Sequence, residues 1–225
     1  MESRSPSQVI SNVHSSIEYV RHHDLRNLID AMRMSLLLLR NGLAHTPPRG
    51  NIVEEPLERL ESVTKALREV LWGHYPRVVD GFHDAPQYVD LGRVVQIAGM
   101  ASQLWPEPEA RVNHLKVKVP ECEVAMVLAL CIEALGGALP ASRDELGRQV
   151  DAQLRLTATL SPRRVHIQIC GPTQLSSATQ LKIANSPCYK TIQQILGRPS
   201  DYMVSVTNDG LSVSCVVHSS STLGE

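Results

Sequence analysis

The first part of the chain carries a helical pattern of apolar residues. Between about residues 7 and 42, apolar side chains recur every three or four positions. At about 100° per residue they fall within roughly one third of the helix circumference. These residues are Ile17, Leu25, Leu28, Ile29, Met32, Leu36, Leu39 and Leu43. The pattern predicts one long amphipathic helix.

A second apolar pattern follows a run of helix-breaking residues at 46–50 and extends from about Val53 to Trp72 or His74. Its apolar positions are Val53, Leu57, Leu60, Val63, Leu67, Val70 and Leu71. Two amphipathic helices joined by a short loop predict an antiparallel hairpin. One hairpin buries only part of each stripe, so we expect a second copy of the chain to complete a homodimeric four-helix bundle.

The pattern changes beyond a connection rich in Gly, Pro and Asp at 76–86. The alternation and apolar runs there predict strands at 87–91, 112–119, 152–160, 164–170, 202–207 and 211–218, and helices at 92–104, 121–139 and 188–196. Asn208-Asp209-Gly210 is a typical hairpin turn. We therefore expect an α+β chain with a helical hairpin domain at 1–76 and an α/β sandwich domain at 87–225.

Composition narrows the possible partners. The 225 residues are 43% hydrophobic, which suffices for a core, and the net charge of −1 argues against a nucleic-acid binder with a basic surface. No stretch approaches 18 apolar residues, and the first residues lack the apolar core of a secretion signal. We expect a soluble, cytoplasmic protein that binds neither nucleic acid nor membrane.

The five cysteines and nine histidines show no metal-ligand spacing. We expect the cysteines to be small buried side chains in a reducing compartment, and we predict no metal site.

The segment His22 to Asn27, His-His-Asp-Leu-Arg-Asn, is the candidate for chemistry. His23 lies almost opposite the centre of the apolar stripe, which predicts an imidazole in solvent with the Asp24 carboxylate beside it. An exposed histidine is ordinarily only a surface residue, and Asp24 alone would then be a solvated carboxylate. His22 lies nearer the edge of the stripe, so we expect it to be partly buried and structural. Asn27, one turn on, shares the outer face with His23.

The run His23-Asp24-Leu25-Arg26-Asn27 resembles the H box of bacterial histidine kinases. In that motif the phosphoacceptor histidine precedes an acid, an apolar residue, a base, Asn or Thr, and usually Pro. Leu28 replaces the proline here, which puts the usual helix kink in doubt. The hairpin resembles the dimerisation and phosphotransfer domain of these kinases. The rest of the chain resembles their ATP-binding domain in element order, so the resemblance covers nearly the whole chain.

The nucleotide motifs of that ATP-binding domain are missing. Residues 127–135 stand in place of its magnesium-binding Asn motif and contain no Asn. Cys170 and Gly171 occupy the position of its adenine-reading Asp-x-Gly motif, and residues 175–179 replace the Gly-rich lid. ATP would therefore have little to hold it. Glu133 interrupts the apolar helix, and we expect a carboxylate at the rim paired with a basic side chain.

This combination resembles histidine phosphotransferases that join a dimeric helical hairpin to a degenerate ATPase-like domain. Two known groups have this form, the sporulation phosphotransferase of bacilli and the ChpT phosphotransferases of alphaproteobacteria, and the motifs do not choose between them. The resemblance implies that phosphoryl groups pass between aspartates of response-regulator receiver domains through His23, without ATP. No cofactor is expected on this chain, because magnesium belongs to the receiver domain.

The residues around His23 then have expected roles. Asp24 would accept a hydrogen bond from the ring and fix its tautomer, and Asn27 would orient the phosphoryl group or a water. Arg26 would add positive charge toward the partner. Two other functions remain open: a divergent ATP-dependent histidine kinase, and a non-catalytic adaptor that binds a response regulator.

Overall fold

The computed structural model describes residues 4–43, 50–72, 87–139, 142–143, 149–150, 153–195 and 202–217. The chain divides into two compact units. One contains Met1–Ile17 and Val78–Glu225, and the other contains Glu18–Arg77. The expected connection at 76–86 lies outside the described residues.

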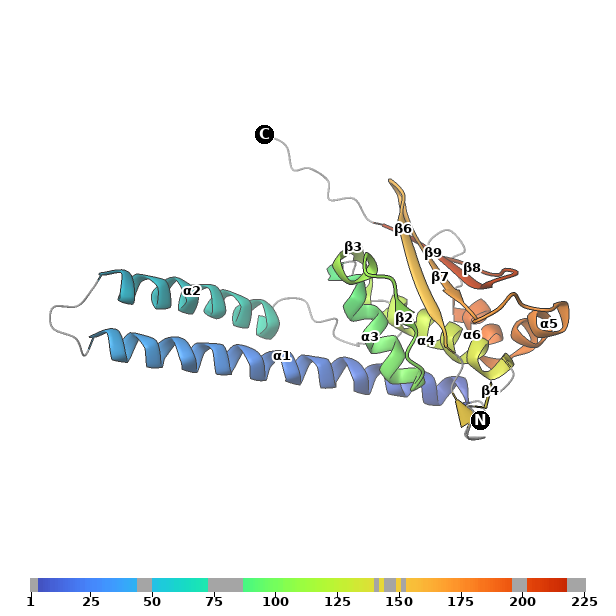
Figure 1. Cartoon of the computed structure of the whole chain (residues 1–225), viewed down its shortest axis with the longest axis horizontal. Coiled ribbons are helices and arrows are strands. Elements are labelled where there is room, and N and C mark those ends of the chain that lie inside the picture. Colours follow the sequence, from blue (N-terminus) through green and yellow to red (C-terminus); the bar gives the residue numbers. More distant parts are fainter. Residues whose placement is uncertain are drawn as a thin grey trace. The chain divides into compact units, whose positions relative to one another are not determined.

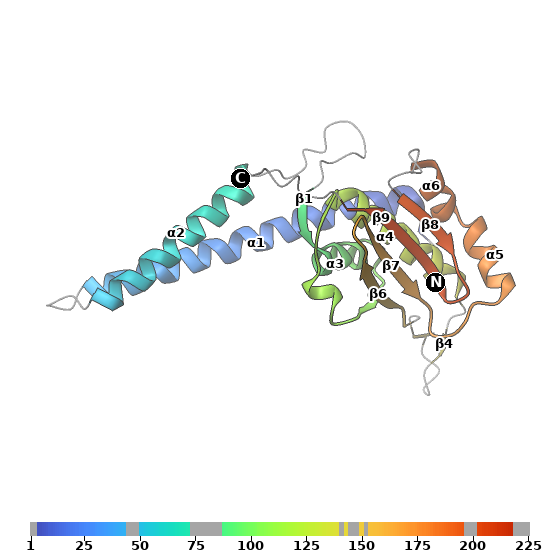
Figure 2. The same cartoon turned by 90° about the horizontal axis from the view of Figure 1, so that it is seen from above.

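The smaller unit is the helical hairpin. It consists of α2 (Gly50–Trp72) and most of α1 (Pro6–Leu43). Figures 1 and 2 show the two helices running side by side in opposite directions. The apolar stripe of α1 is only partly covered within the chain: Leu25, Leu28, Met32 and Leu39 are half-buried, whereas Ile29, Leu36 and Leu43 are exposed. The expected hairpin is present, and it leaves apolar surface uncovered.

A five-stranded sheet organises the larger unit, in the order β2-β6-β7-β9-β8. The strands are β2 (Glu107–Pro108), β6 (Arg155–Leu160), β7 (Arg164–Cys170), β8 (Tyr202–Val206) and β9 (Gly210–Val216). Only β2 pairs in parallel, with β6. Burial alternates along β7, where Val165, Ile167 and Ile169 are buried and His166 is exposed, so the sheet has one covered face.

Helices cover that face, as the views in Figures 1 and 2 show. They are α3 (Leu91–Ser102), α4 (Glu121–Ala138), α5 (Ser177–Asn185) and α6 (Pro187–Ile195). A short antiparallel pair, β1 (Gln87–Asp90) with β3 (Lys116–Val119), lies before and after α3 in the chain, and η1 (Val112–His114) precedes β3. A further pair joins β4 (Ser142–Arg143) to β5 (Gln149–Val150). The mixed α+β class is therefore as expected.

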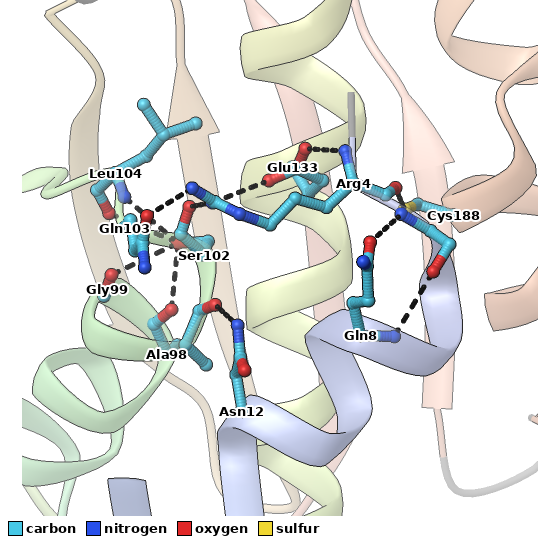
Figure 3. Close-up of polar contacts among 12 residues, drawn as sticks. Arg4, Gln8, Asn12, Ala98, Gly99, Ser102, Gln103, Leu104, Glu133 and Cys188 are labelled. Carbon is cyan, nitrogen blue, oxygen red and sulfur yellow. Dashed lines mark hydrogen bonds and ion pairs between the residues drawn. The ribbon is translucent and has the colours of Figure 1, made fainter. Parts of the chain in front are cut away.

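Residues 1–17 are expected in the hairpin domain at 1–76, whereas the start of α1 belongs to this larger unit. Arg4 fixes it there, as Figure 3 shows. The backbone N–H of Arg4 donates to Glu133 Oε1 at 2.7 Å, and its guanidinium lies 3.6 Å from Glu133 Oε2. The guanidinium also donates to the Ser102 carbonyl and to Gln103, while Asn12 donates to the Ala101 carbonyl at 3.0 Å. The first 17 residues are therefore a structural part of the unit that is otherwise formed by Val78–Glu225.

Glu133 itself confirms one expectation and corrects another. It pairs with a basic side chain, but at 3% exposure it is buried in the domain and does not lie at a rim. The reason is that Arg4 arrives from outside α4 and brings the countercharge into the interior, where an unpaired carboxylate would be costly.

Several elements differ from the sequence expectations, which include neither α5 nor the two-residue strands β2, β4 and β5. Residues 112–114 form a 3₁₀ turn, so the strand expected at 112–119 begins only at Lys116. Residues 177–185, for which the sequence pattern predicts neither helix nor strand, form α5, whose first turn is capped by Ser176 accepting from the Thr179 N–H at 3.2 Å. The expected hairpin turn is confirmed: β9 begins at Gly210, whose φ of 158° suits glycine, and a Cβ there would meet Ile169 O at 1.9 Å.

All five cysteines are free thiols, and Cys122, Cys131, Cys188 and Cys215 are buried as expected. Burial raises the pKa of Cys188 to about 11, with the nearby Glu133 carboxylate adding to the rise. Burial also raises the pKa of Cys131, with Cys188 contributing, and raises that of Cys215 to about 12. These thiols stay protonated near neutral pH and so lack the nucleophilic thiolate form.

Arg4→Ala is expected to lower the free energy of unfolding by about 2–3 kcal/mol, because it leaves the Glu133 carboxylate buried without its partner. Urea denaturation would measure this. Arg111→Ala, which removes an exposed arginine of the same unit, is the matched control and should change stability by less than about 0.5 kcal/mol. Adding Glu133→Gln to Arg4→Ala should recover part of the loss. Equal stability of the Arg4 and Arg111 variants would contradict this account.

Stability is expected to fall as the pH rises above about 9. The unfolded chain releases its thiol protons near pH 8.5, whereas folded Cys188 keeps its proton until about pH 11. The unfolded state therefore binds fewer protons in this range, and unfolding is favoured. Urea midpoints at pH 7.5, 9 and 10 would show the decline, and Cys188→Ala should make it shallower. An identical slope in that variant would argue against the contribution of Cys188.

Candidate functional site

The His23 side chain projects from the hairpin part of α1 and is 60% exposed. The amide nitrogen of Asn27, Nδ2, lies 3.2 Å from ring atom Nδ1. This is the contact expected between residues four apart on one helix face. Within the described part of the chain nothing bonds to the other ring nitrogen, Nε2. The ring is therefore held on one side and open on the other.

Two neutral arrangements satisfy the contact between Asn27 and His23. If the amide nitrogen faces the ring, it donates to Nδ1 and the ring proton sits on Nε2. Rotating the amide by 180° places its oxygen there instead, so that Nδ1–H donates and Nε2 keeps a free lone pair. A carboxylate oxygen of Asp24 lies 3.9 Å from Nδ1. In the second arrangement Nε2 is the nucleophilic ring nitrogen.

The neighbouring residues depart from their expected places. Asp24 is 32% exposed, and its 3.9 Å separation from Nδ1 is too long for the hydrogen bond expected of it. Asn27 makes the ring contact instead, because position i+4 faces position i on a helix and position i+1 does not. Arg26 is exposed and forms no contact with the ring. His22 is exposed as well, so its expected partly buried role is wrong.

The α4 segment at 127–135 is packed into the core. Leu130, Cys131 and Ile132 are fully buried, and Glu133 is engaged by Arg4. These side chains therefore offer no polar group to a phosphate or a metal ion.

The loop after β7, which begins at Gly171, is hydrogen-bonded to the turn between β8 and β9. Gly171 N–H donates to the Asp209 carbonyl at 3.0 Å, and Leu175 N–H donates to the Asn208 carbonyl at 2.6 Å. The Leu139 side chain lies against Gly171, where an added Cβ would be 3.4 Å from it. Residues 177–185 then form the regular helix α5. The Ser176 cap could have indicated this helix from the sequence.

A cavity of about 490 Å³ opens beside the start of α3. Its charged residues have partners within the fold: Asp90 accepts from the Gly92 N–H at 3.0 Å, and Arg93 Nε lies 3.0 Å from Glu121 Oε1. These groups are explained by helix capping and ion pairing.

Among the described residues, no three His, Cys, Asp or Glu side chains gather into a group that could hold a metal ion. None of the described helices combines the length and apolar character needed to cross a membrane.

No family model and no curated protein matches the sequence. Solved structures do resemble the chain. One is the histidine kinase AdeS of Acinetobacter baumannii, with 15% identity and a TM-score of 0.39 over 88% of this chain and 98% of that one. Another is the histidine kinase ThkA, in a complex with the response regulator protein TrrA, with 14% identity and a TM-score of 0.36 over 96% of this chain and 64% of that one. The chain thus spans less than two thirds of ThkA. Likenesses of this size assign the chain neither a family nor an activity.

Proposed function

We propose that the protein is a histidine phosphotransferase. In this proposal His23 accepts a phosphoryl group from an aspartyl phosphate of one response-regulator receiver domain and passes it to an aspartate of another. The observation that carries the proposal is the geometry of His23: an exposed imidazole, held through Nδ1 beside Asn27 and Asp24, with Nε2 open to a partner.

The chemistry needs only the lone pair of Nε2. That nitrogen attacks the phosphorus in line with the bond to the aspartyl oxygen. The P–N bond forms as the P–O bond breaks, and the receiver's carboxylate leaves with the electron pair of that bond. Nδ1 keeps its proton throughout, and the hydrogen bond to Asn27 holds the ring in the attacking orientation. A carboxylate of the second receiver reverses these steps, and the receiver supplies the magnesium ion.

The core packing supports a protein as phosphoryl donor in place of ATP. Leu130, Cys131 and Ile132 of α4 are fully buried, and the loop after β7 is hydrogen-bonded to the turn between β8 and β9. A divergent ATP-dependent kinase would require polar groups that bind phosphates and magnesium in this region. Titration with magnesium and ATP separates the two functions, because a kinase must bind the nucleotide.

The exposed apolar residues of the hairpin support a homodimer. Ile29, Leu36 and Leu43 lie within about 40° of one another on the α1 helical wheel, and all three are exposed. A second hairpin covering this stripe would complete a four-helix bundle. We therefore propose the homodimer as the working form.

The proposal is tested by incubating the protein with a panel of isolated receiver domains phosphorylated by acetyl phosphate. Acid-labile label should appear on the unaltered protein and be absent from His23→Ala, because the nucleophile is gone. His22→Ala is the matched control, since it removes the adjacent exposed histidine and should retain the label. Label that survives in His23→Ala, or its absence from the unaltered protein with every receiver, would refute the proposal. An adaptor would bind a receiver and acquire no label.

Asn27 provides a second test. Asn27→Ala should slow phosphoryl transfer about tenfold, because it removes the hydrogen bond that orients the ring. Asn27→Asp keeps an oxygen beside Nδ1–H and should retain most of the rate. Rapid-quench measurement of phosphohistidine formation gives both values. Equal losses in the two variants would mean that the amide donates to Nδ1, which contradicts the proposed tautomer.

A further inference from the structure

The larger unit has a cavity with an exposed tryptophan in its wall. This is the cavity beside the start of α3, and its volume of about 490 Å³ lies within the range of about 300–1,000 Å³ that is usual for small-molecule sites. Trp105 lines it and is 63% exposed. A large aromatic side chain in solvent at the wall of a cavity provides an apolar surface for a ligand.

The Trp105 ring is held in place by the backbone around it. It lies against α3 at Gly99, where an added Cβ would be only 3.2 Å from ring atom Cε3. Two residues further on, the chain enters the sheet, and the Glu107 N–H donates to the Leu154 carbonyl at 2.7 Å. A side chain fixed in this way loses little conformational freedom when a ligand packs on it.

One stripe of α3 runs along the cavity. Gly92, Gln96 and Gly99 are spaced by four and three residues, so they follow one another on the same face of the helix. Asn113 lies over the first of them, since a Cβ added to Gly92 would be 3.0 Å from its Oδ1, and Trp105 lies against the last. The two ends of the stripe are about 10 Å apart, at about 1.5 Å per residue.

The uncharged polar groups at the cavity are open to a ligand, in contrast to its charged groups. Asp90 caps α3, and Arg93 is in an ion pair. Gln96 and Asn113 are exposed, and within the described part of the chain neither side-chain amide has a hydrogen-bond partner. The same holds for the indole N–H of Trp105. An amide both donates and accepts, so these groups suit a ligand that has donors and acceptors along one edge.

We infer that this cavity binds a small, uncharged molecule with a fused heteroaromatic ring system. The ring stacks on Trp105, and its edge is hydrogen-bonded by the amides of Gln96 and Asn113. More than one ring is needed, because the ligand has to extend along about 10 Å from the indole to Asn113. This site goes beyond the proposed phosphotransfer, and none of residues 127–135 or 171–179 lines it.

The charges at the cavity favour an uncharged ligand. The Arg93 guanidinium is paired with Glu121, at 3.0 Å between Nε and Oε1, and Asp90 places a carboxylate in the same wall. A ligand with a phosphate or a carboxylate would bring a second negative charge close to Asp90. Among the described residues that line the cavity, no unpaired cation offsets that repulsion.

The test is isothermal titration calorimetry of the full chain with guanosine, riboflavin and neopterin, three fused heteroaromatics that are uncharged at neutral pH. At least one of them should bind with saturation. Ribose and ribitol, which carry hydroxyl groups and no ring, should not bind. The phosphate ester of the probe that binds should bind about threefold more weakly or worse, because of the charge of Asp90.

Variants locate the binding site. Trp105→Ala should weaken binding about tenfold or more, because the stacking surface is gone, whereas Trp105→Phe keeps a flat ring and should weaken it less than about threefold. Gln96→Ala should weaken binding about fivefold through the lost hydrogen bond. Tyr88→Ala is the matched control: it removes an aromatic residue of the same unit that is 64% exposed and lies outside the cavity, and it should leave the affinity unchanged. Equal urea midpoints would show that the variants are folded.

The outcomes separate this inference from the proposed function. Absence of binding by all three probes, or equal affinities of Trp105→Ala and Tyr88→Ala for the probe that binds, would overturn the site. Equal or tighter binding of the phosphate ester would overturn the assignment to uncharged ligands. None of these results touches transfer through His23, because the residues that line the cavity all belong to the larger unit and His23 belongs to the hairpin.

Discussion

Helix α4 is buried on nearly every side, and the larger unit is arranged around that constraint. Its middle residues are apolar, so it needs cover from the sheet, from α3 and from α6. Two carboxylates interrupt the apolar surface, Glu121 and Glu133, at 4% and 3% exposure. A buried carboxylate is tolerated only with a countercharge, and each of these lies beside an arginine, Arg93 in the first case and Arg4 in the second. Neutralisation of Glu133 by Arg4, together with the full burial of Val9 and Val13, accounts for the place of the start of α1 in a unit that otherwise begins at Val78.

The same packing bears on nucleotide binding. A helix that holds phosphates and magnesium must present polar side chains to an open cleft, whereas α4 directs Leu130, Cys131 and Ile132 into the core. Leu139 then lies against Gly171, and the loop beyond it is hydrogen-bonded to the turn between β8 and β9. A side chain at these positions can either pack in the core and stabilise the domain or face a cleft and bind ATP. The residues present pack in the core, which is why we propose a partner protein as the phosphoryl donor.

Sequence patterns predicted the elements whose periodicity is strong. The first helix was expected at 7–42 and is Pro6–Leu43, and the buried helix was expected at 121–139 and is Glu121–Ala138. The apolar pattern does not predict helix α5, because its residues are mostly polar and only Ile183 is buried. The ion pair of Arg4 with Glu133 joins positions 129 residues apart, and no local pattern marks it. The contact of Asn27 with His23 was within reach of the sequence, since helix geometry brings i and i+4 together and turns i+1 about 100° away.

A reactive group on a single helix differs from one in a pocket. The surface of a single helix is convex, so the described residues of α1 around His23 do not enclose a bound phosphorus or surround its charge with fixed dipoles. Their contribution in the proposed function is to orient the ring through the hydrogen bond to Asn27. The proposal therefore assigns the stabilisation of the transition state to the partner. A single orienting hydrogen bond, worth about tenfold in rate, is a small part of the rate enhancement that enzymes reach, so in the proposed function most of the acceleration depends on groups of the partner.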